Sequence, residues 1–273
     1  MARIELPPCL DNIELEPEEP REPLLPYWAE AREPLPCLIF LLPILVAYEV
    51  GVLWIGSGQP NGLRNGADFW MRGWLQQAGL QAFILPAILI GVLLIWHKVG
   101  KFPWRISRET LVGMFAESLL LAVVLLFVAQ LQDMAFQCFF PSDVAVRENM
   151  PGERPLLAID AKLGQRMISY LGAGVYEEVM FRLMLIPAAL LVLTRAFRMP
   201  GKWAAVMAVF LTSLAFSVAH YVGSGGEAFS LFSFTFRTTA GCFFGTVFLL
   251  RGFGITVGCH ALYDVMVGLL TAG

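Results

Sequence analysis

The chain has 273 residues, of which 57% are hydrophobic and only 15% are charged. Several apolar runs approach the roughly 20 residues that a helix needs to cross a bilayer, so the composition predicts a polytopic membrane protein. The net charge of -3 is small and does not indicate a nucleic-acid partner. The five cysteines are scattered without a CxxC pair, which favours packing residues over a disulfide framework or a metal site.

Residues 1–36 are rich in Pro and Glu, with the stretch "ELEPEEPREPLLP". They are too polar to bury and lack the basic start and apolar run of a cleavable signal peptide. We therefore expect a flexible cytoplasmic tail over 1–36, followed by N-terminal transmembrane helices and loops over 37–162.

The remaining chain predicts an all-α fold, a transmembrane helical bundle with about seven spans. The apolar runs place them at 37–56, 80–96, 111–131, 167–194, 203–222, 228–250 and 255–272. An eighth span over 69–82 is the alternative, but this segment carries Trp70 and Trp74 beside Arg64 and Arg72. It is better interpreted as an interfacial helix.

Orientation follows from the basic residues in the short loops. With seven spans, three basic loops fall on one side, which predicts a cytoplasmic N-terminus in a bacterial cytoplasmic membrane. They carry Lys98, Lys101, Arg105 and Arg108, then Arg195, Arg198 and Lys202, and finally Arg251. The connection from 132 to 165 also carries basic residues and is assigned outside, because long loops obey the rule poorly.

The fourth span contains "EEVMFR", with Glu177, Glu178 and Arg182. An ionised residue at the centre of a span costs about 2.5–3.5 kcal/mol, so these three need partners. Glu178 and Arg182 are four residues apart with the acid first, which predicts an internal ion pair. Glu177 projects about 100° away and must find its partner on another helix.

Two later helices offer partners. The fifth span places Phe216 and His220 four residues apart, and the seventh places His260 and Asp264 at the same spacing. Each histidine taken alone is as well explained by a hydrogen bond to a neighbouring helix, and His97 is interpreted as an interfacial residue.

Other polar residues carry weaker signals. Glu49 and Glu117 are intramembrane acids without a motif, so packing or a wet crevice explains them better, and the sequence leaves the role of Arg237 open. The small-residue pairs Gly241/Gly245 and Gly254/Gly258 are typical of helix contacts, and they predict a close approach of the sixth and seventh spans.

The motifs EExxxR, FxxxH and HxxxD follow one another on successive helices. In that order and spacing, the chain resembles the CPBP family of intramembrane proteases, which includes the CAAX prenyl endopeptidases of the Rce1 type and bacterial Abi-type relatives. The resemblance covers about 163–272, and we assign 163–273 to a CPBP-like catalytic core.

The resemblance implies hydrolysis of a peptide bond in a membrane protein or lipidated peptide within the lipid bilayer. It implies that Glu177 is the general base and that His220 helps to hold and polarise the water. His260 and Asp264 would stabilise the oxyanion or complete the site, although an ionised Asp264 can only accept hydrogen bonds and could instead orient His260. In a supporting role, Glu178 and Arg182 would set the geometry of Glu177, and Phe216 would pack beneath His220.

A zinc ion is a possible cofactor, because one Glu and two His form an acceptable zinc set with an open fourth position. The metal set would be Glu177, His220 and His260. The family has been described both as metalloprotease and as metal-independent glutamate protease. The chain has no HExxH, which excludes a zincin-like site.

Depth in the membrane poses a difficulty for this site, because His220 lies near the end of one span and His260 near the start of a parallel one. A fifth helix that ends inside the membrane, followed by a re-entrant turn over 221–227, would bring them together. We predict that turn as part of the cavity wall.

Three other functions remain open. Ser224 with His260 suggests a serine protease, but this leaves the acid pair unexplained. Intramembrane acids and histidines also form the proton relays of transporters, although the chain shows no inverted repeat. A non-catalytic immunity or binding member of the family is the third.

Overall fold

The computed structural model describes residues 26–55, 64–140, 161–223 and 226–270. Within these residues the chain is helical, as the sequence predicts. The elements are α1 (Tyr27–Glu30), α2 (Pro34–Ile55), α3 (Gly66–Gln77), η2 (Ala82–Ile84), α4 (Leu85–Val99), α5 (Arg108–Phe139), α7 (Ala161–Gly172), the π-helical η3 (Ala173–Leu185), α8 (Ile186–Arg195), α9 (Gly201–Ala219), α10 (Leu231–Arg251) and α11 (Phe253–Leu270).

Five helical segments of the described chain are long and apolar enough to cross a membrane: α2, η2 with α4, α5, α9 and α11. The continuous α7–η3–α8 segment and α10 occupy the other two predicted spans, and both carry charged residues within them. The protein is thus an integral membrane helical bundle, and the count of seven spans stays a prediction.

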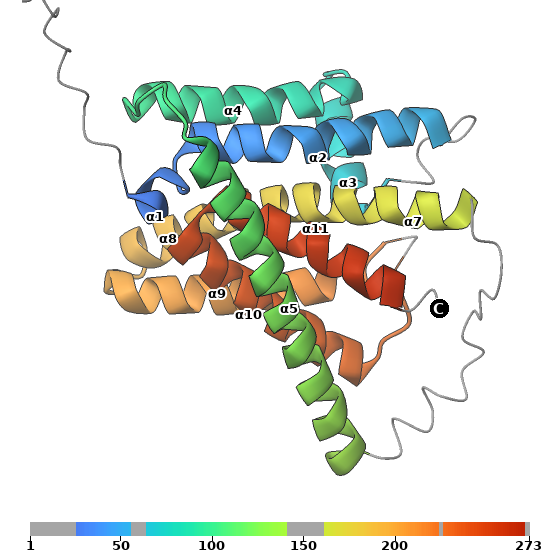
Figure 1. Cartoon of the computed structure of the whole chain (residues 1–273). Helices are drawn as coiled ribbons and strands as arrows, with labels where there is room; N and C mark the ends of the chain where they lie inside the picture. Colours follow the sequence, from blue (N-terminus) through green and yellow to red (C-terminus); the bar gives the residue numbers. More distant parts are fainter. Residues whose placement is uncertain (1–25, 56–63, 141–160, 224–225, 271–273) are drawn as a thin grey trace, which may run out of the picture.

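The bundle is built around α11. This helix contacts α5, η3, α10, α7 and α2, and most of its first half is fully buried. Figure 1 shows α2 beside α4 on one side of α11, α9 beside α10 on the other, and α5 crossing obliquely. Large apolar side chains on α2, α4 and α5 remain exposed, as expected for helices that face lipid.

The small-residue pairs make different contacts from those predicted. A Cβ added to Gly241 or Gly245 would meet Ser213 or Val209 of α9. At Gly254 and Gly258 it would instead meet side chains of α2 and α5. The expected approach of the sixth and seventh spans through these glycines is therefore wrong, because spacing shows that a helix has a smooth face but not which neighbour covers it.

The folded chain begins before the predicted end of the tail. Residues 1–25 lie outside the described residues, but α1 and the start of α2 are packed on the bundle, with Glu30 and Glu33 buried. Both carboxylate oxygens of Glu30 accept hydrogen bonds at the start of α5, from Ser107 and Thr110. Burial of Glu30 is tolerated because its carboxylate has these partners, which composition alone does not reveal.

Candidate active site

The π-helical segment η3 carries both glutamates and the arginine of the first motif. It packs closely on α11, because Gly174 leaves room for the α11 backbone: a Cβ there would lie 2.8 Å from the backbone nitrogen of Ala261. Single π-helical segments within longer helices are frequent at functional sites. The close approach brings Glu178 of η3 against His260 of α11.

Glu178, Arg182 and His260 form a cluster that we call the inner cluster. Arg182 Nη1 lies 3.0 Å from Glu178 Oε1, which confirms the predicted ion pair, and the two side chains are 2% and 0% exposed. The Arg182 guanidinium also lies over the rings of Phe216 and Phe244, 4.6 and 5.3 Å from their centroids. Such burial is tolerable only because each charge is compensated.

His260 is held on both sides of its ring. Its Nδ1 lies 2.6 Å from Glu178 Oε1, and because a carboxylate only accepts, this nitrogen carries the proton. On the other side, Nε2 lies 3.5 Å from Asp264 Oδ2 and 3.9 Å from Glu177 Oε2. The ring also stacks on Phe244 with centroids 4.4 Å apart. Glu178 thus contacts His260 directly, and Arg182 is joined to His260 through Glu178.

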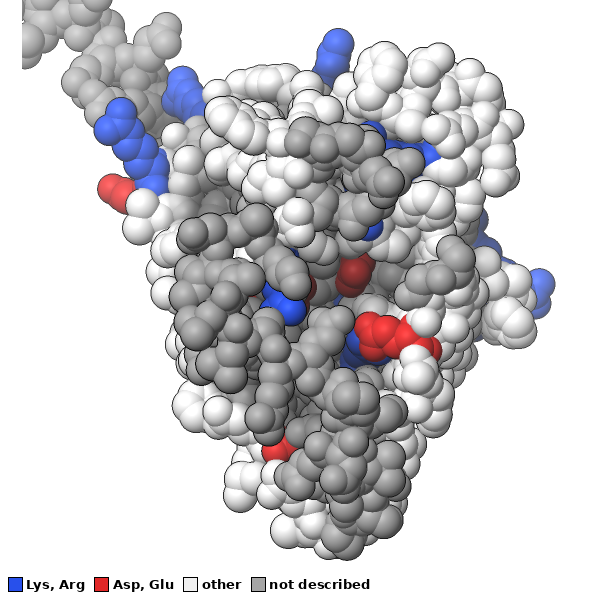
Figure 2. Space-filling model, turned by 90° about the vertical axis from the view of Figure 1, so that its right-hand side faces the viewer, with Lys and Arg blue, Asp and Glu red and all other residues white. Residues whose placement is uncertain are grey.

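Glu177 and His220 line the same cavity, which has a volume of about 440 Å³. Figure 2 shows a hollow in this face of the molecule, with acidic atoms visible inside it. The rest of the wall mixes apolar and charged residues: it includes Phe69, Trp70, Met180, Phe181, Ala219 and Gly223, together with Arg64 and Glu227. The acid of the pair that faces the cavity is therefore Glu177, while Glu178 is fully buried in the inner cluster.

His220 follows the last residue of α9. Its Nδ1 lies 2.8 Å from the carbonyl oxygen of Phe216, so Nδ1 donates its hydrogen and the neutral ring presents a lone pair at Nε2. The Phe216 ring lies against both histidines, with centroids 5.0 Å from His220 and 6.3 Å from His260. Phe216 therefore packs beneath His220 as expected and bridges the two helices.

The turn after α9 closes one side of the cavity. The backbone nitrogen of Glu227 donates to the carbonyl of His220 at 3.0 Å, and Gly223 has a φ of 97°, in the left-handed region. Val222, Gly223 and Glu227 line the cavity, as predicted for this turn. Ser224, the serine of the alternative mechanism, lies outside the described residues.

The predicted metal set does not assemble in the described part of the chain. There, no group of three or more His, Cys, Asp or Glu side chains is arranged to hold a metal ion. The described contacts of His260 are instead with acids: its Nδ1 is bonded to Glu178, and its Nε2 faces Glu177 and Asp264. These residues do not fit the zinc site proposed from the sequence.

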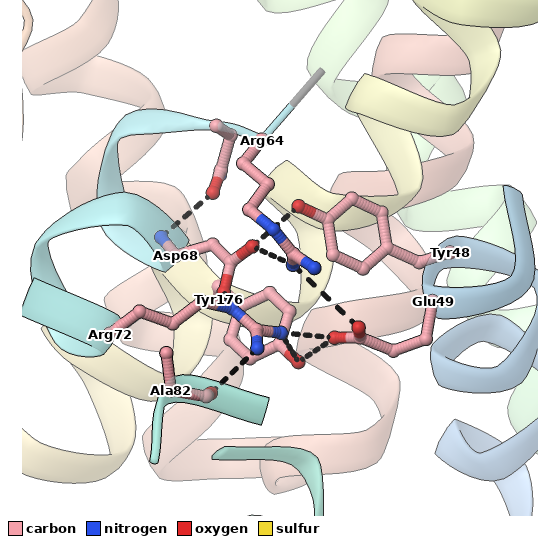
Figure 3. A network of polar contacts seen from close by, with 8 residues as sticks. Tyr48, Glu49, Arg64, Asp68, Arg72, Ala82 and Tyr176 are labelled. Carbon is pink, nitrogen blue, oxygen red and sulfur yellow. Dashed lines mark hydrogen bonds and ion pairs between the residues drawn. The ribbon is translucent and has the colours of Figure 1, made fainter. Parts of the chain in front are cut away.

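The structure adds a group of residues that the sequence analysis did not connect with the site. We call it the α3 network; it joins α2, α3 and η3 through Tyr48, Glu49, Arg64, Asp68, Arg72 and Tyr176 (Figure 3). Asp68 accepts from Tyr48, Arg64 and Arg72, and Glu49 accepts from Arg72 and Tyr176.

The sequence analysis interpreted residues 69–82 as an interfacial helix and so missed these contacts. In the structure Arg72 is buried, with only 7% of its surface exposed. Helix α3 begins at Gly66 and packs against η3. Arg64, two residues before the helix, lines the cavity. A signal was present in the sequence: Arg64, Asp68 and Arg72 are each four residues apart, a spacing that puts Asp68 and Arg72 on one face of α3.

Comparison with known proteins agrees with the motifs. Residues 161–266 match the model of a family described as Type II CAAX prenyl endopeptidase Rce1-like. Comparison with curated proteins and with solved structures gives no match. The match spans α7 to α11 and includes all three motifs, and residues 1–160 lie outside it. Over residues 161–266, the chain is therefore similar to this family of proteases.

Proposed function

We propose that the protein is an intramembrane endopeptidase that hydrolyses a peptide bond of a membrane-embedded or lipid-anchored protein, with a water activated by Glu177 and His220. One observation carries the proposal. Glu177 of η3 and His220 at the end of α9 line one cavity, whereas the neighbouring acid, Glu178, is fully buried and paired with Arg182. Only one acid of the pair is thus available to a water and a peptide.

In this proposal Glu177 takes a proton from the water, and the oxygen attacks the peptide carbonyl carbon. His220 accepts a hydrogen bond from the same water at Nε2, because its Nδ1 is committed to Phe216. The carbon–nitrogen bond then breaks, and Glu177 returns the proton to the leaving nitrogen.

The inner cluster supports Glu177 from behind. His260 faces the Glu177 carboxylate with Nε2, and Asp264 and Glu178 balance the charge that His260 carries when protonated. We therefore assign His260 to the placement of Glu177, and Asp264 to the orientation of His260.

The test is proteolysis by the purified protein in liposomes against a library of membrane peptides. We expect Glu177→Gln to lower the cleavage rate by about 10³-fold, within the range for loss of a general base. The matched control is Glu227→Gln, because Glu227 is an acid that lines the same cavity but pairs with Arg237. It should retain most of the activity.

Wild-type cleavage that Glu177→Gln leaves unchanged would contradict the proposal. Loss of cleavage in Ser224→Ala, with Glu177→Gln still active, would favour the serine alternative. A chelator arm in the same assay reports whether any metal is required. Proton-coupled flux in the vesicles without proteolysis would favour a transporter.

A further inference from the structure

The Glu177 carboxylate is contacted from two elements that are far apart in the chain. His260 Nε2 lies 3.9 Å from Oε2, and the side-chain nitrogen of Asn65 donates to Oε1 at 3.3 Å. His260 belongs to the region that matches the protease family. Asn65 lies outside this region, almost 100 residues before its first residue. The cavity acid therefore has a partner in the N-terminal part of the chain.

The direction of the Asn65 side chain is fixed by a second contact. Asn65 is the N-cap of α3, and its side-chain oxygen accepts from the backbone nitrogen of Asp68 at 2.9 Å. A backbone N–H can only donate, so the atom facing it must be the amide oxygen. The amide nitrogen is thereby turned toward Glu177, and one side chain both caps a helix and donates to the cavity acid.

The helix that carries Asn65 is itself fixed by the α3 network. Three residues on, Asp68 is 0% exposed and accepts from Tyr48 at 2.7 Å, from Arg64 at 2.7 Å and from Arg72 at 2.5 Å. The network then reaches η3, because Tyr176 donates to Glu49 at 2.5 Å, and Tyr176 precedes Glu177 in the chain. Asn65 and Glu177 are thus held in register by bonds on both sides.

We propose that Asn65 is a positioning residue for Glu177, supplied by α3 and fixed by the α3 network. The hydrogen bond at Oε1 sets the rotamer of the carboxylate and leaves Oε2 to take the proton of the water. The inference rests on the proposed hydrolytic function, in which Glu177 is the base. It adds a residue from the segment that precedes the family match to the machinery of the site.

The experiment separates the cap from the donor. Asn65→Ser keeps a good N-cap but is too short to reach Glu177, so we expect kcat to fall about tenfold, the loss of one hydrogen bond to a charged group, with KM and the unfolding midpoint unchanged. Asn65→Gln keeps an amide donor but is a poorer cap. It should unfold more readily than Asn65→Ser and yet retain more of kcat.

The N-cap of another helix, α5, provides the control for loss of a cap alone. Ser107 caps α5 and accepts from the backbone nitrogen of Thr110. Ser107→Ala should lower the unfolding midpoint without changing kcat, because it removes a cap that has no link to the cavity. Rates are measured with the peptide that the wild type cleaves in the library assay.

Two outcomes would overturn the inference: wild-type kcat in Asn65→Ser, or a fall in kcat matched by an equal loss of stability. The proposed function has its own readout in the same series. If Glu177→Gln stays active, the hydrolytic role of Glu177 fails. If Glu177→Gln is inactive while Asn65→Ser cleaves like the wild type, only the role of Asn65 fails.

Discussion

Two clusters of buried charge each include a chain neighbour of Glu177, Glu178 in one and Tyr176 in the other. The inner cluster joins η3 to α11 through Glu178, Arg182 and His260, all within the family match. The α3 network joins α2, α3 and η3, and most of its members precede that match. The first contains motif residues that resemble those of a known protease, whereas the second contains none of them. The difference teaches that the carboxylate of Glu177 has neighbours from two parts of the chain, and that the motif reports only one of them.

Breaking the inner cluster should have the largest effect on stability. Glu178→Ala leaves Arg182 and His260 buried without their acid, and we expect a loss of about 4 kcal/mol in the free energy of unfolding. Unfolding in detergent by an SDS titration measures it. The double variant Glu178→Ala/Arg182→Leu should regain part of the loss, because it removes the uncompensated charge. Equal stability of the two variants would show that the ion pair is not the cause.

Breaking the α3 network should cost somewhat less. Asp68→Ala removes the acid between Arg64 and Arg72, and we expect a loss of about 3 kcal/mol, because Glu49 still compensates part of the positive charge. The cleavage rate should fall too, since Asp68 fixes the helix that carries Asn65. An unchanged rate in this variant would mean that the network is structural only, and that the two clusters do not share a function.

The tyrosines of the α3 network allow a finer comparison. Tyr48→Phe and Tyr176→Phe each remove one hydroxyl that donates to an acid, Asp68 or Glu49. Each should cost about 1.5 kcal/mol, as for a hydrogen bond to a charged group. We expect Tyr176→Phe to reduce kcat more than Tyr48→Phe, because Tyr176 lies next to Glu177 in η3. The reverse order would argue against transmission through Tyr176.

The smallest effect is expected at the ion pair between Glu117 and Arg251, neither of which lines the cavity. Glu117 pairs with Arg251 and accepts from Tyr27, but the two charged side chains are 22% and 24% exposed. Glu117→Gln should therefore cost roughly 1 kcal/mol or less, with wild-type cleavage. A large loss of activity would show that the site depends on the whole bundle and not on the two clusters beside Glu177.

Contacts within one helix were predictable from sequence. The pair Glu178–Arg182 forms because four residues bring two side chains to one helix face, and Phe216 lies against His220 for the same reason. The turn over 221–227 was predicted from the need to place two histidines at one depth. The same rule of spacing applied to Arg64, Asp68 and Arg72, but their polarity beside two tryptophans favoured an interfacial interpretation.

By itself, the sequence determined that the chain is a helical membrane protein, that charged residues lie inside an otherwise apolar helical segment, and that three motifs resembling those of a protease family follow one another. These are local properties of composition and spacing. Only the tertiary structure decided that Glu178 binds His260, that Glu177 faces the cavity, and that Asn65 reaches it from α3. Those contacts join helices distant in sequence, and they depend on which faces pack together, which a spacing of three or four residues cannot encode.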